Sequence, residues 1–414
     1  MATTVLRPYP SVCYKSVVLA IGCTPSRKAK RLRRRYLADE NERSPSACLE
    51  KSMETPTATN SIAWTMLSVA IALIGTVLFY SIRKRTNGIC LTPSNVSRKA
   101  QSLPVKGEPG VYKCGLLSDD QNYIDSIYPE VKTLWDAFNR GIKESDDGPC
   151  LGTRGADGQY YFMKYTDVLK QSSHLASALV GVFNLKPGER IGIYAKNRAE
   201  WLISALACVL QSIIIVPLYD TLGVDVIPFI ISQAEISVII AESSEKLQNL
   251  TSLRSLLPTL KTVVLMDWHD NANATAEMNA AGIELLSLQE AYRRGSQNPQ
   301  PKHLPKRDDT YIISYTSGST GTPKGVIITH YNILSNISGW LWTMNHFIPN
   351  IINNKTCVIS YLPLAHVMEQ VTHWMTLMHG AQIGYYSGNI QVSLKSVVIV
   401  VLVFFPHPDV NYIN

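Results

Sequence analysis

The chain alternates helix-like and strand-like segments from Thr166 to Met266, and this alternation limits the possible fold more than any other feature. We expect helices at residues 166–183, 199–211, 224–234 and 244–256, and strands at residues 190–195, 213–218, 237–241 and 262–266. The strand segments are continuous apolar runs, such as Ile213 to Val216, rather than alternating apolar and polar residues. Strands of this kind are buried on both faces. The pattern therefore predicts an α/β fold with a largely parallel sheet and helices on each side.

The segment from Tyr315 to Gly325, YTSGSTGTPKG, has the composition of a phosphate-binding loop. Its glycines allow the backbone to turn amide N–H groups toward an anion, its hydroxyl groups add donors, and Lys324 adds a positive charge. Residues 311–313 are typical of a short buried strand and residues 329–342 have helical spacing, so we expect the loop to connect a strand to a helix. The candidate cofactor-binding residues are Thr316, Ser317, Gly318, Ser319, Thr320, Gly321, Thr322, Lys324 and Gly325.

Two other interpretations of this segment are weaker. A flexible Gly/Ser/Thr linker is the usual fate of such a composition, but the set spacing of three glycines, a proline and a lysine has chance odds of roughly 10⁻³ or less. A Walker-type loop requires a hydroxyl residue directly after its lysine, and Gly325 follows Lys324 here. The segment therefore indicates ATP chemistry of another type.

The loop resembles the phosphate-binding signature of the adenylate-forming (AMP-binding) enzymes. Four further segments are similar to the long-chain fatty acyl-CoA synthetases of that family and follow in the same order: GPCLGTR (148–154), IGIYAKNRAEW (191–201), IVPLYDTLG (215–223) and YLPLAHVME (361–369). The resemblance extends from about Tyr112 to about Ile390. It implies the fold of the large N-terminal domain of an adenylate-forming enzyme, with mostly parallel sheets flanked by helices.

The same resemblance implies an acid–thiol ligase that activates long-chain fatty acids with ATP, Mg²⁺ and CoA through an acyl-adenylate. Lys324 would be the charge partner of the phosphates. The resemblance places His366 in the acyl-adenylate pocket, where it would orient the carboxylate or a phosphoryl oxygen, and the alternative is a structural histidine at a strand-to-helix junction. Glu369 is expected to be a cap or a salt-bridge partner rather than a base. Lys324 and His366 are thus the candidate catalytic residues, His366 is also the candidate substrate-binding residue, and no residue is assigned to a metal.

Several later motifs of the family are not found. They are the acid that holds magnesium, the aspartate that binds the ribose, the hinge and the small C-terminal domain. We therefore expect residues 111–390 to be a partial, C-terminally truncated adenylation domain with weak or no activity by itself, followed by a divergent apolar tail at 391–414. The alternative function is a non-catalytic, membrane-tethered module that binds nucleotide or acyl chains, or that associates with a full-length synthetase.

The formal net charge of +7 comes from the N-terminal part of the chain. Residues 1–100 contain 16 Lys and Arg against 5 Asp and Glu, whereas the remainder contains 23 against 27. We expect residues 1–60 to be a basic, disordered tail, and the charge of the remainder gives no indication of nucleic-acid binding. The eight cysteines include no C-x-x-C pair, which favours a reducing compartment and no structural zinc.

The segment from Ser61 to Ile82 contains no charged residue. At about 1.5 Å per residue it is long enough to cross a bilayer core of about 30 Å. We interpret it as a transmembrane anchor, with a buried core helix as the alternative. Arg83, Lys84 and Arg85 follow it directly, so the positive-inside rule places the C-terminal part in the cytosol. Residues 83–110 are the expected linker, and the expected membrane is that of the endoplasmic reticulum first and the mitochondrial outer membrane second.

Overall fold

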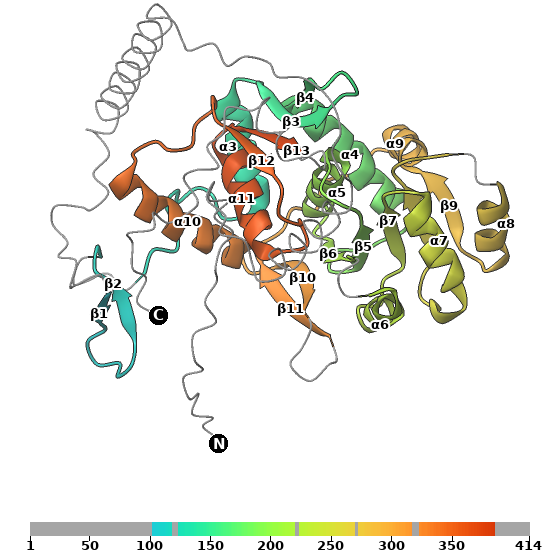
Figure 1. The fold of residues 1–414 in the computed structure, drawn as a ribbon, viewed down its shortest axis with the longest axis horizontal. Coiled ribbons are helices and arrows are strands. Elements are labelled where there is room, and N and C mark those ends of the chain that lie inside the picture. The colour runs from blue at the N-terminus through green and yellow to red at the C-terminus, as the bar shows by residue number, and fades with distance from the viewer. Residues whose placement is uncertain (1–101, 118–122, 220–222, 270–271, 317–322, 386–414) are drawn as a thin grey trace, which may run out of the picture. The chain divides into compact units, whose positions relative to one another are not determined.

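The computed structural model describes residues 102–117, 123–219, 223–269, 272–316 and 323–385, all within one compact unit, Thr86–Phe405 (Figure 1). The predicted basic tail, transmembrane segment and apolar tail lie outside the described residues. Among the residues that are described, no helix is long and apolar enough to cross a membrane.

The helices of the described part are α3 (Leu134–Ser145), α4 (Tyr165–Gly181), α5 (Ala199–Val209), α6 (Ile227–Gln233), α7 (Ser244–Ser252), α8 (Ala272–Ala280), α9 (Leu288–Gln297), α10 (His330–Phe347) and α11 (Val367–Met378), with 3-10 turns η3 (Val224–Val226) and η4 (Arg254–Leu256). Its strands are β1 (Ser102–Pro104), β2 (Tyr112–Cys114), β3 (Pro149–Arg154), β4 (Tyr160–Lys164), β5 (Arg190–Tyr194), β6 (Ile214–Pro217), β7 (Val238–Ala241), β8 (Thr262–Leu265), β9 (Glu284–Ser287), β10 (Thr310–Thr316), β11 (Lys324–Thr329), β12 (Cys357–Ser360) and β13 (Gln382–Tyr385). Every helix and strand expected between residues 166 and 266 is present, so this part of the prediction is confirmed.

The described strands form a seven-stranded sheet in the order β11-β10-β6-β5-β7-β8-β9 and a four-stranded sheet in the order β12-β13-β3-β4. All neighbours in the larger sheet are parallel except β10 and β11. In the smaller sheet only β3 and β4 are antiparallel. The predicted α/β fold with a largely parallel sheet is therefore confirmed.

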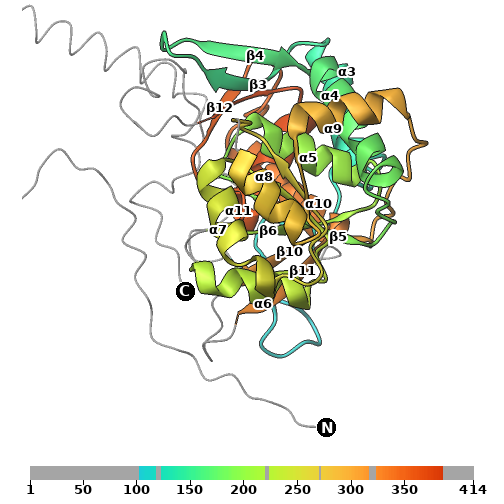
Figure 2. The same cartoon turned by 90° about the vertical axis from the view of Figure 1, so that its right-hand side faces the viewer.

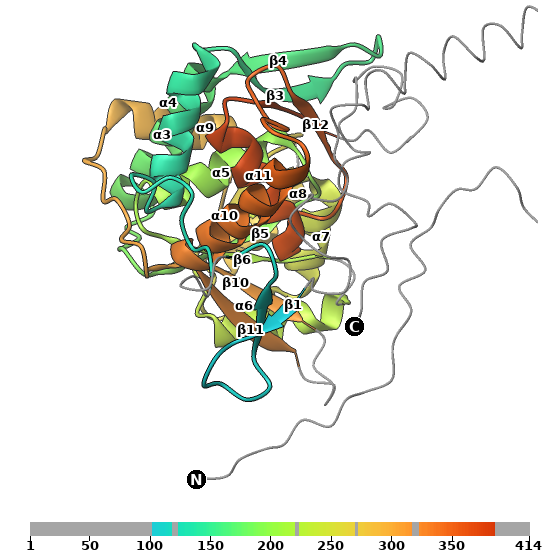
Figure 3. The same cartoon turned by 90° about the vertical axis from the view of Figure 1, so that its left-hand side faces the viewer.

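Helices cover both faces of the seven-stranded sheet. Successive residues of a strand point to opposite faces, so Ile193 of β5 packs in the core of α4, α5 and α9, and the next residue, Tyr194, packs in the core of α6 and α7. Figure 2 looks onto α6, α7 and α8, and Figure 3 shows α3, α10 and α11 from the other side. The core that contains Ile193 also includes Leu151 of β3 and Ile383 of β13, so it joins the two sheets.

The phosphate-loop segment is followed by a strand, which corrects the predicted strand-to-helix connection. β10 and β11 pair antiparallel, with Thr316 opposite Lys324 and Tyr315 opposite Gly325. The helix begins only at His330, after the capping residue Thr329. The signal was available in the sequence, because Val326, Ile327 and Ile328 form a β-branched run that favours a strand.

The predicted linker at 83–110 contains a strand in its described part. β1 pairs antiparallel with β2, and Ser102 lies opposite Cys114. Gly107 and Gly110 of the connecting turn have φ angles of 86° and 82°. Glycine adopts this region without a steric cost, whereas residues with a Cβ rarely do. The end of the expected linker is therefore a short hairpin.

Candidate functional site

Segments that follow four different strands come together at the carboxyl edge of the parallel strands. Asn197 follows β5, Tyr219 follows β6, Thr316 ends β10, and the segment 361–366 follows β12. In open α/β sheets, ligands bind in crevices at this edge because the loops there are neighbours in space. The contacts of these side chains with one another define the candidate site.

The phosphate-loop residues that the structure describes flank the loop on paired strands. Thr316 is the exposed last residue of β10, and Lys324 is the exposed first residue of β11. Directly opposed residues of an antiparallel pair project from the same face, so this hydroxyl and this ammonium group lie on one side of the hairpin. The remaining candidates lie outside the described residues: Ser317, Gly318, Ser319, Thr320, Gly321 and Thr322.

Gly325 has a packing role that the sequence did not reveal. A Cβ at this position would lie 2.8 Å from Ile313 Cγ2 and 3.1 Å from Tyr315 Cζ. The Tyr315 ring therefore occupies the space that a side chain at residue 325 would need. The Tyr315 hydroxyl also donates a hydrogen bond to Gln233 Oε1 at 2.7 Å, which fixes the ring against α6. Gly325 thus allows β11 to pack against the side chains of Ile313 and Tyr315, and this role is independent of phosphate binding.

Tyr219 connects the end of β10 to His366. Its hydroxyl donates a hydrogen bond to the Tyr315 carbonyl oxygen at 2.6 Å. Its ring centroid lies 6.0 Å from that of His366, with the ring planes inclined by 49°. Burial raises the pKa of Tyr219, so the phenol remains a donor at neutral pH. We did not assign Tyr219 a role from the sequence, where the only signal was its place in the IVPLYDTLG segment.

His366 stands at the expected strand-to-helix junction. β12 ends at Ser360, α11 begins at Val367, and His366 is the N-cap residue. Its side chain makes no capping hydrogen bond and is exposed, while its backbone carbonyl accepts from the Glu369 amide at 3.1 Å. The backbone of His366 therefore serves the helix, and its imidazole is accessible to a ligand beside Tyr219.

Asn197 holds the segment that leads to His366. Its Nδ2 donates to Ser360 Oγ at 2.8 Å and to the Leu362 carbonyl oxygen at 2.5 Å. Its Oδ1 accepts from the Leu364 amide at 2.8 Å. These three hydrogen bonds join the turn after β5 in the larger sheet to the turn after β12 in the smaller one. Asn197 is thus a positioning residue for His366, which the sequence alone did not identify.

A buried carboxyl group lies one helical turn after His366. Glu369 is 2% exposed, and burial raises the pKa of its carboxyl to about 7, against the opposing effect of hydrogen bonds from Ser360 and the Tyr361 amide. His373 Nδ1 donates to the Glu369 carbonyl oxygen at 2.9 Å and lies 3.6 Å from Glu369 Oε1. Burial lowers the pKa of His373 to about 4, so the imidazole is neutral at pH 7 and forms no ion pair. His373 is thus a buried, neutral packing residue.

The fold and the edge site define this part of the chain as an α/β domain with a candidate ligand site at the carboxyl edge of its parallel strands. Residues 140–401 match the family model for the AMP-binding enzymes, and the chain belongs to that family.

Its curated relatives include long-chain-fatty-acid–CoA ligases. Long-chain-fatty-acid–CoA ligase 1 of Cavia porcellus is 38% identical over 309 residues, and the same-named protein of Homo sapiens is 36% identical over 309 residues. Each alignment covers 74% of this chain and 44% of the relative. The chain therefore spans less than half the length of these curated relatives.

A solved structure agrees with the fold. The A-PCP didomain of the carboxylic acid reductase from Segniliparus rugosus, in complex with AMP, matches with a TM-score of 0.55 at 21% identity. The match covers 65% of this chain and 41% of that chain. At this identity the likeness shows the fold alone, and it confirms the expected α/β fold of an adenylate-forming domain.

Proposed function

We propose that this protein takes part in the ATP-dependent activation of long-chain fatty acids to acyl-CoA through an acyl-adenylate. The observation that carries the proposal is the arrangement around Tyr219, which places the strand end that leads into the phosphate loop next to His366. A phosphate group and a carboxylate bound there would be neighbours. The similarity to long-chain-fatty-acid–CoA ligases over 74% of the chain supports the fatty acid as the carboxylate.

The reaction explains why these groups belong together. A thiol does not displace the oxygen of a carboxylate, so the carboxylate oxygen first attacks the α-phosphorus of ATP and pyrophosphate leaves. The CoA thiol then attacks the acyl carbon, AMP leaves with the oxygen, and the thiol proton is released. Lys324 would stabilise charge on the departing pyrophosphate, and His366 would orient the carboxylate or a phosphoryl oxygen.

Magnesium commonly accompanies ATP in phosphoryl chemistry. Within the described residues, no three His, Cys, Asp or Glu side chains gather in a way that could hold a metal ion. We therefore assign none of the described residues to magnesium.

The test uses the purified chain with palmitate, ATP and Mg²⁺, and measures palmitate-dependent exchange of labelled pyrophosphate into ATP and palmitoyl-CoA formation after CoA is added. Because residues 111–390 are expected to be a partial adenylation domain, we expect weak exchange in the wild type, and a further loss of roughly tenfold or more in His366→Ala. The unfolding midpoint of this variant should not change, because the imidazole is exposed and caps nothing. Binding of ATP or palmitate without exchange would contradict the catalytic proposal and favour the non-catalytic module.

We also propose that Ser61 to Ile82 anchors the protein in the endoplasmic reticulum membrane with the described domain in the cytosol. The support is the uncharged segment and the basic residues that follow it. The protein should stay in the membrane pellet after alkaline carbonate extraction, and a glycosylation site inserted after Arg85 should remain unmodified. Release by carbonate, or glycosylation at the inserted site, would overturn this assignment.

A further inference from the structure

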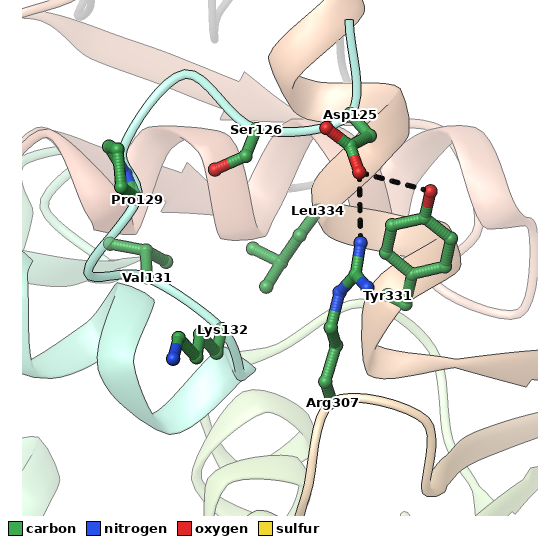
Figure 4. Close-up of a pocket in the computed structure, with 8 residues that line it drawn as sticks. All are labelled: Asp125, Ser126, Pro129, Val131, Lys132, Arg307, Tyr331 and Leu334. Carbon is green, nitrogen blue, oxygen red and sulfur yellow. Dashed lines mark hydrogen bonds and ion pairs between the residues drawn. The ribbon is translucent and has the colours of Figure 1, made fainter.

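A pocket of about 410 Å³ lies beside the first turns of α10. The segment 125–132 forms one side, Arg307 closes the base, and Tyr331 and Leu334 of α10 complete the lining (Figure 4). Pockets of 300–1,000 Å³ with an apolar lining and a few polar groups are typical small-molecule sites.

The pocket is separate from the candidate functional site. Arg307 precedes the start of β10 and Tyr331 follows the end of β11, whereas Thr316 and Lys324 stand at the other end of the same hairpin. Six residues of strand at about 3.3 Å each put the two ends roughly 20 Å apart. A ligand in the pocket would therefore lie at the amino edge of β10, away from the carboxyl edge.

The walls of the pocket are held in place without a ligand. Asp125 Oδ2 accepts hydrogen bonds from Arg307 at 2.9 Å and from the Tyr331 hydroxyl at 3.3 Å, and the Arg307 guanidinium lies 3.8 Å from the centre of the Tyr331 ring. The Ile127 amide donates to Ser338 Oγ of α10 at 3.2 Å. These contacts tie the segment 125–132 to the helix, so binding would require little reorganisation.

The charged residues of the lining carry a net charge of +1, from Arg307, Lys132 and Asp125. Asp125 neutralises Arg307. Lys132 is exposed on the side of the pocket away from this pair, and no ion-pair partner for it occurs among the described residues (Figure 4). Val131 and Leu334, which are 8% and 5% exposed, also line the pocket. The pocket thus offers a single cation next to an apolar floor.

We propose that this pocket binds an amphipathic molecule with one negative charge. Its apolar body would pack on Val131 and Leu334, and its anionic head would lie at Lys132. The inference goes beyond the proposed function and does not rest on it, because it concerns another edge of the sheet and other residues.

Photolabelling of the full chain tests the proposal. The probe is octanoate with a terminal diazirine, and labelled peptides are mapped by mass spectrometry. We expect labelling within residues 123–132 and 330–338, suppressed by excess octanoate and much less by excess octanol, which lacks the charge. Lys132→Gln should reduce labelling about two- to fivefold, the range for an exposed charge pair. The matched control is Lys143→Gln, an exposed lysine of α3 outside the pocket, and it should leave labelling unchanged.

A second variant tests whether labelling depends on access to the pocket itself. Ser126→Tyr places a ring at an exposed position of the lining, so it should abolish labelling of both segments. The variant loses only the exposed hydrogen bond from the Ser126 hydroxyl to the Tyr128 carbonyl oxygen, so the thermal unfolding midpoint should change little. Labelling confined to residues 361–368 would overturn the inference, and so would equal suppression by octanol or equal labelling of Lys132→Gln and wild type. Labelling of the pocket in a protein that shows no pyrophosphate exchange would support this inference while the proposed function fails.

Discussion

Replacing Glu369 with glutamine is expected to make the protein increasingly more stable than the wild type as the pH rises. The difference in the free energy of unfolding should grow by roughly 3 kcal/mol between about pH 4 and pH 8, at about 1.4 kcal/mol for each pH unit by which the pKa is displaced. Glutamine resembles the neutral acid in shape and does not ionise. The variant therefore removes the cost of ionising a carboxyl group in the core.

The sign follows from the burial of Glu369. Its carboxyl is 2% exposed, and burial raises its pKa from 4.5 to about 7. Between these values the unfolded chain releases a proton that the folded chain keeps. The stabilising contribution of the neutral acid is fully present below pH 4.5 and is lost as the pH rises through about 7.

Neighbouring groups do not reverse this expectation. Burial lowers the pKa of His373 to about 4, and that effect acts in the opposite direction, because a buried neutral histidine gains stability as the pH rises from 4 toward 6.5. His373 is present in both proteins, so the burial of its imidazole contributes to both stability curves. Burial raises the pKa of Tyr361 and of Tyr385, so neither phenol titrates in this range.

Urea unfolding at one-unit steps from about pH 4 to pH 8 would measure the difference. Glu108→Gln is the matched control, because Glu108 is exposed on the turn between β1 and β2. Its stability curve should run parallel to that of the wild type. A parallel curve for Glu369→Gln as well would show that the carboxyl does not titrate with a raised pKa.

The second large effect is expected for Lys324→Ala. If the hairpin end binds phosphate, removing this ammonium deletes a charge-assisted contact that contributes about 1.5–3 kcal/mol, or roughly a 10- to 150-fold loss of ATP affinity. Folding should be unaffected, because the Lys324 side chain is exposed at the start of β11. Isothermal titration calorimetry with ATP and Mg²⁺ gives the affinity directly.

Lys261→Ala is a suitable control for charge alone. Lys261 is also exposed, but it precedes β8 and so lies at the amino edge of the sheet. We expect this variant to bind ATP as the wild type does. Equal ATP affinity in Lys324→Ala would mean that the loop only connects two strands.

The residue pattern along the chain was sufficient to predict a strand where hydrophobicity alone decided its burial. The continuous Ile and Val run of β6 has to be covered on both faces, and the structure buries it between two helical layers. The strand β11 was missed although its β-branched residues favour a strand. Pairing with β10 makes residues 324–329 a strand. The paired residues run from Thr316 and Lys324 at one end to Thr310 and Thr329 at the other.

The sequence by itself determined the family, the parallel α/β core between residues 166 and 266, and the position of His366 at a strand-to-helix junction. These depend on the order and spacing of residues that are close along the chain. Only the tertiary structure decided that Asn197 holds the segment before His366, that Tyr219 joins this histidine to the end of β10, and that Glu369 is buried. The physical reason is that a hydrogen bond between distant segments and the dielectric environment of a carboxyl group depend on which elements pack together, and residue spacing does not specify that packing.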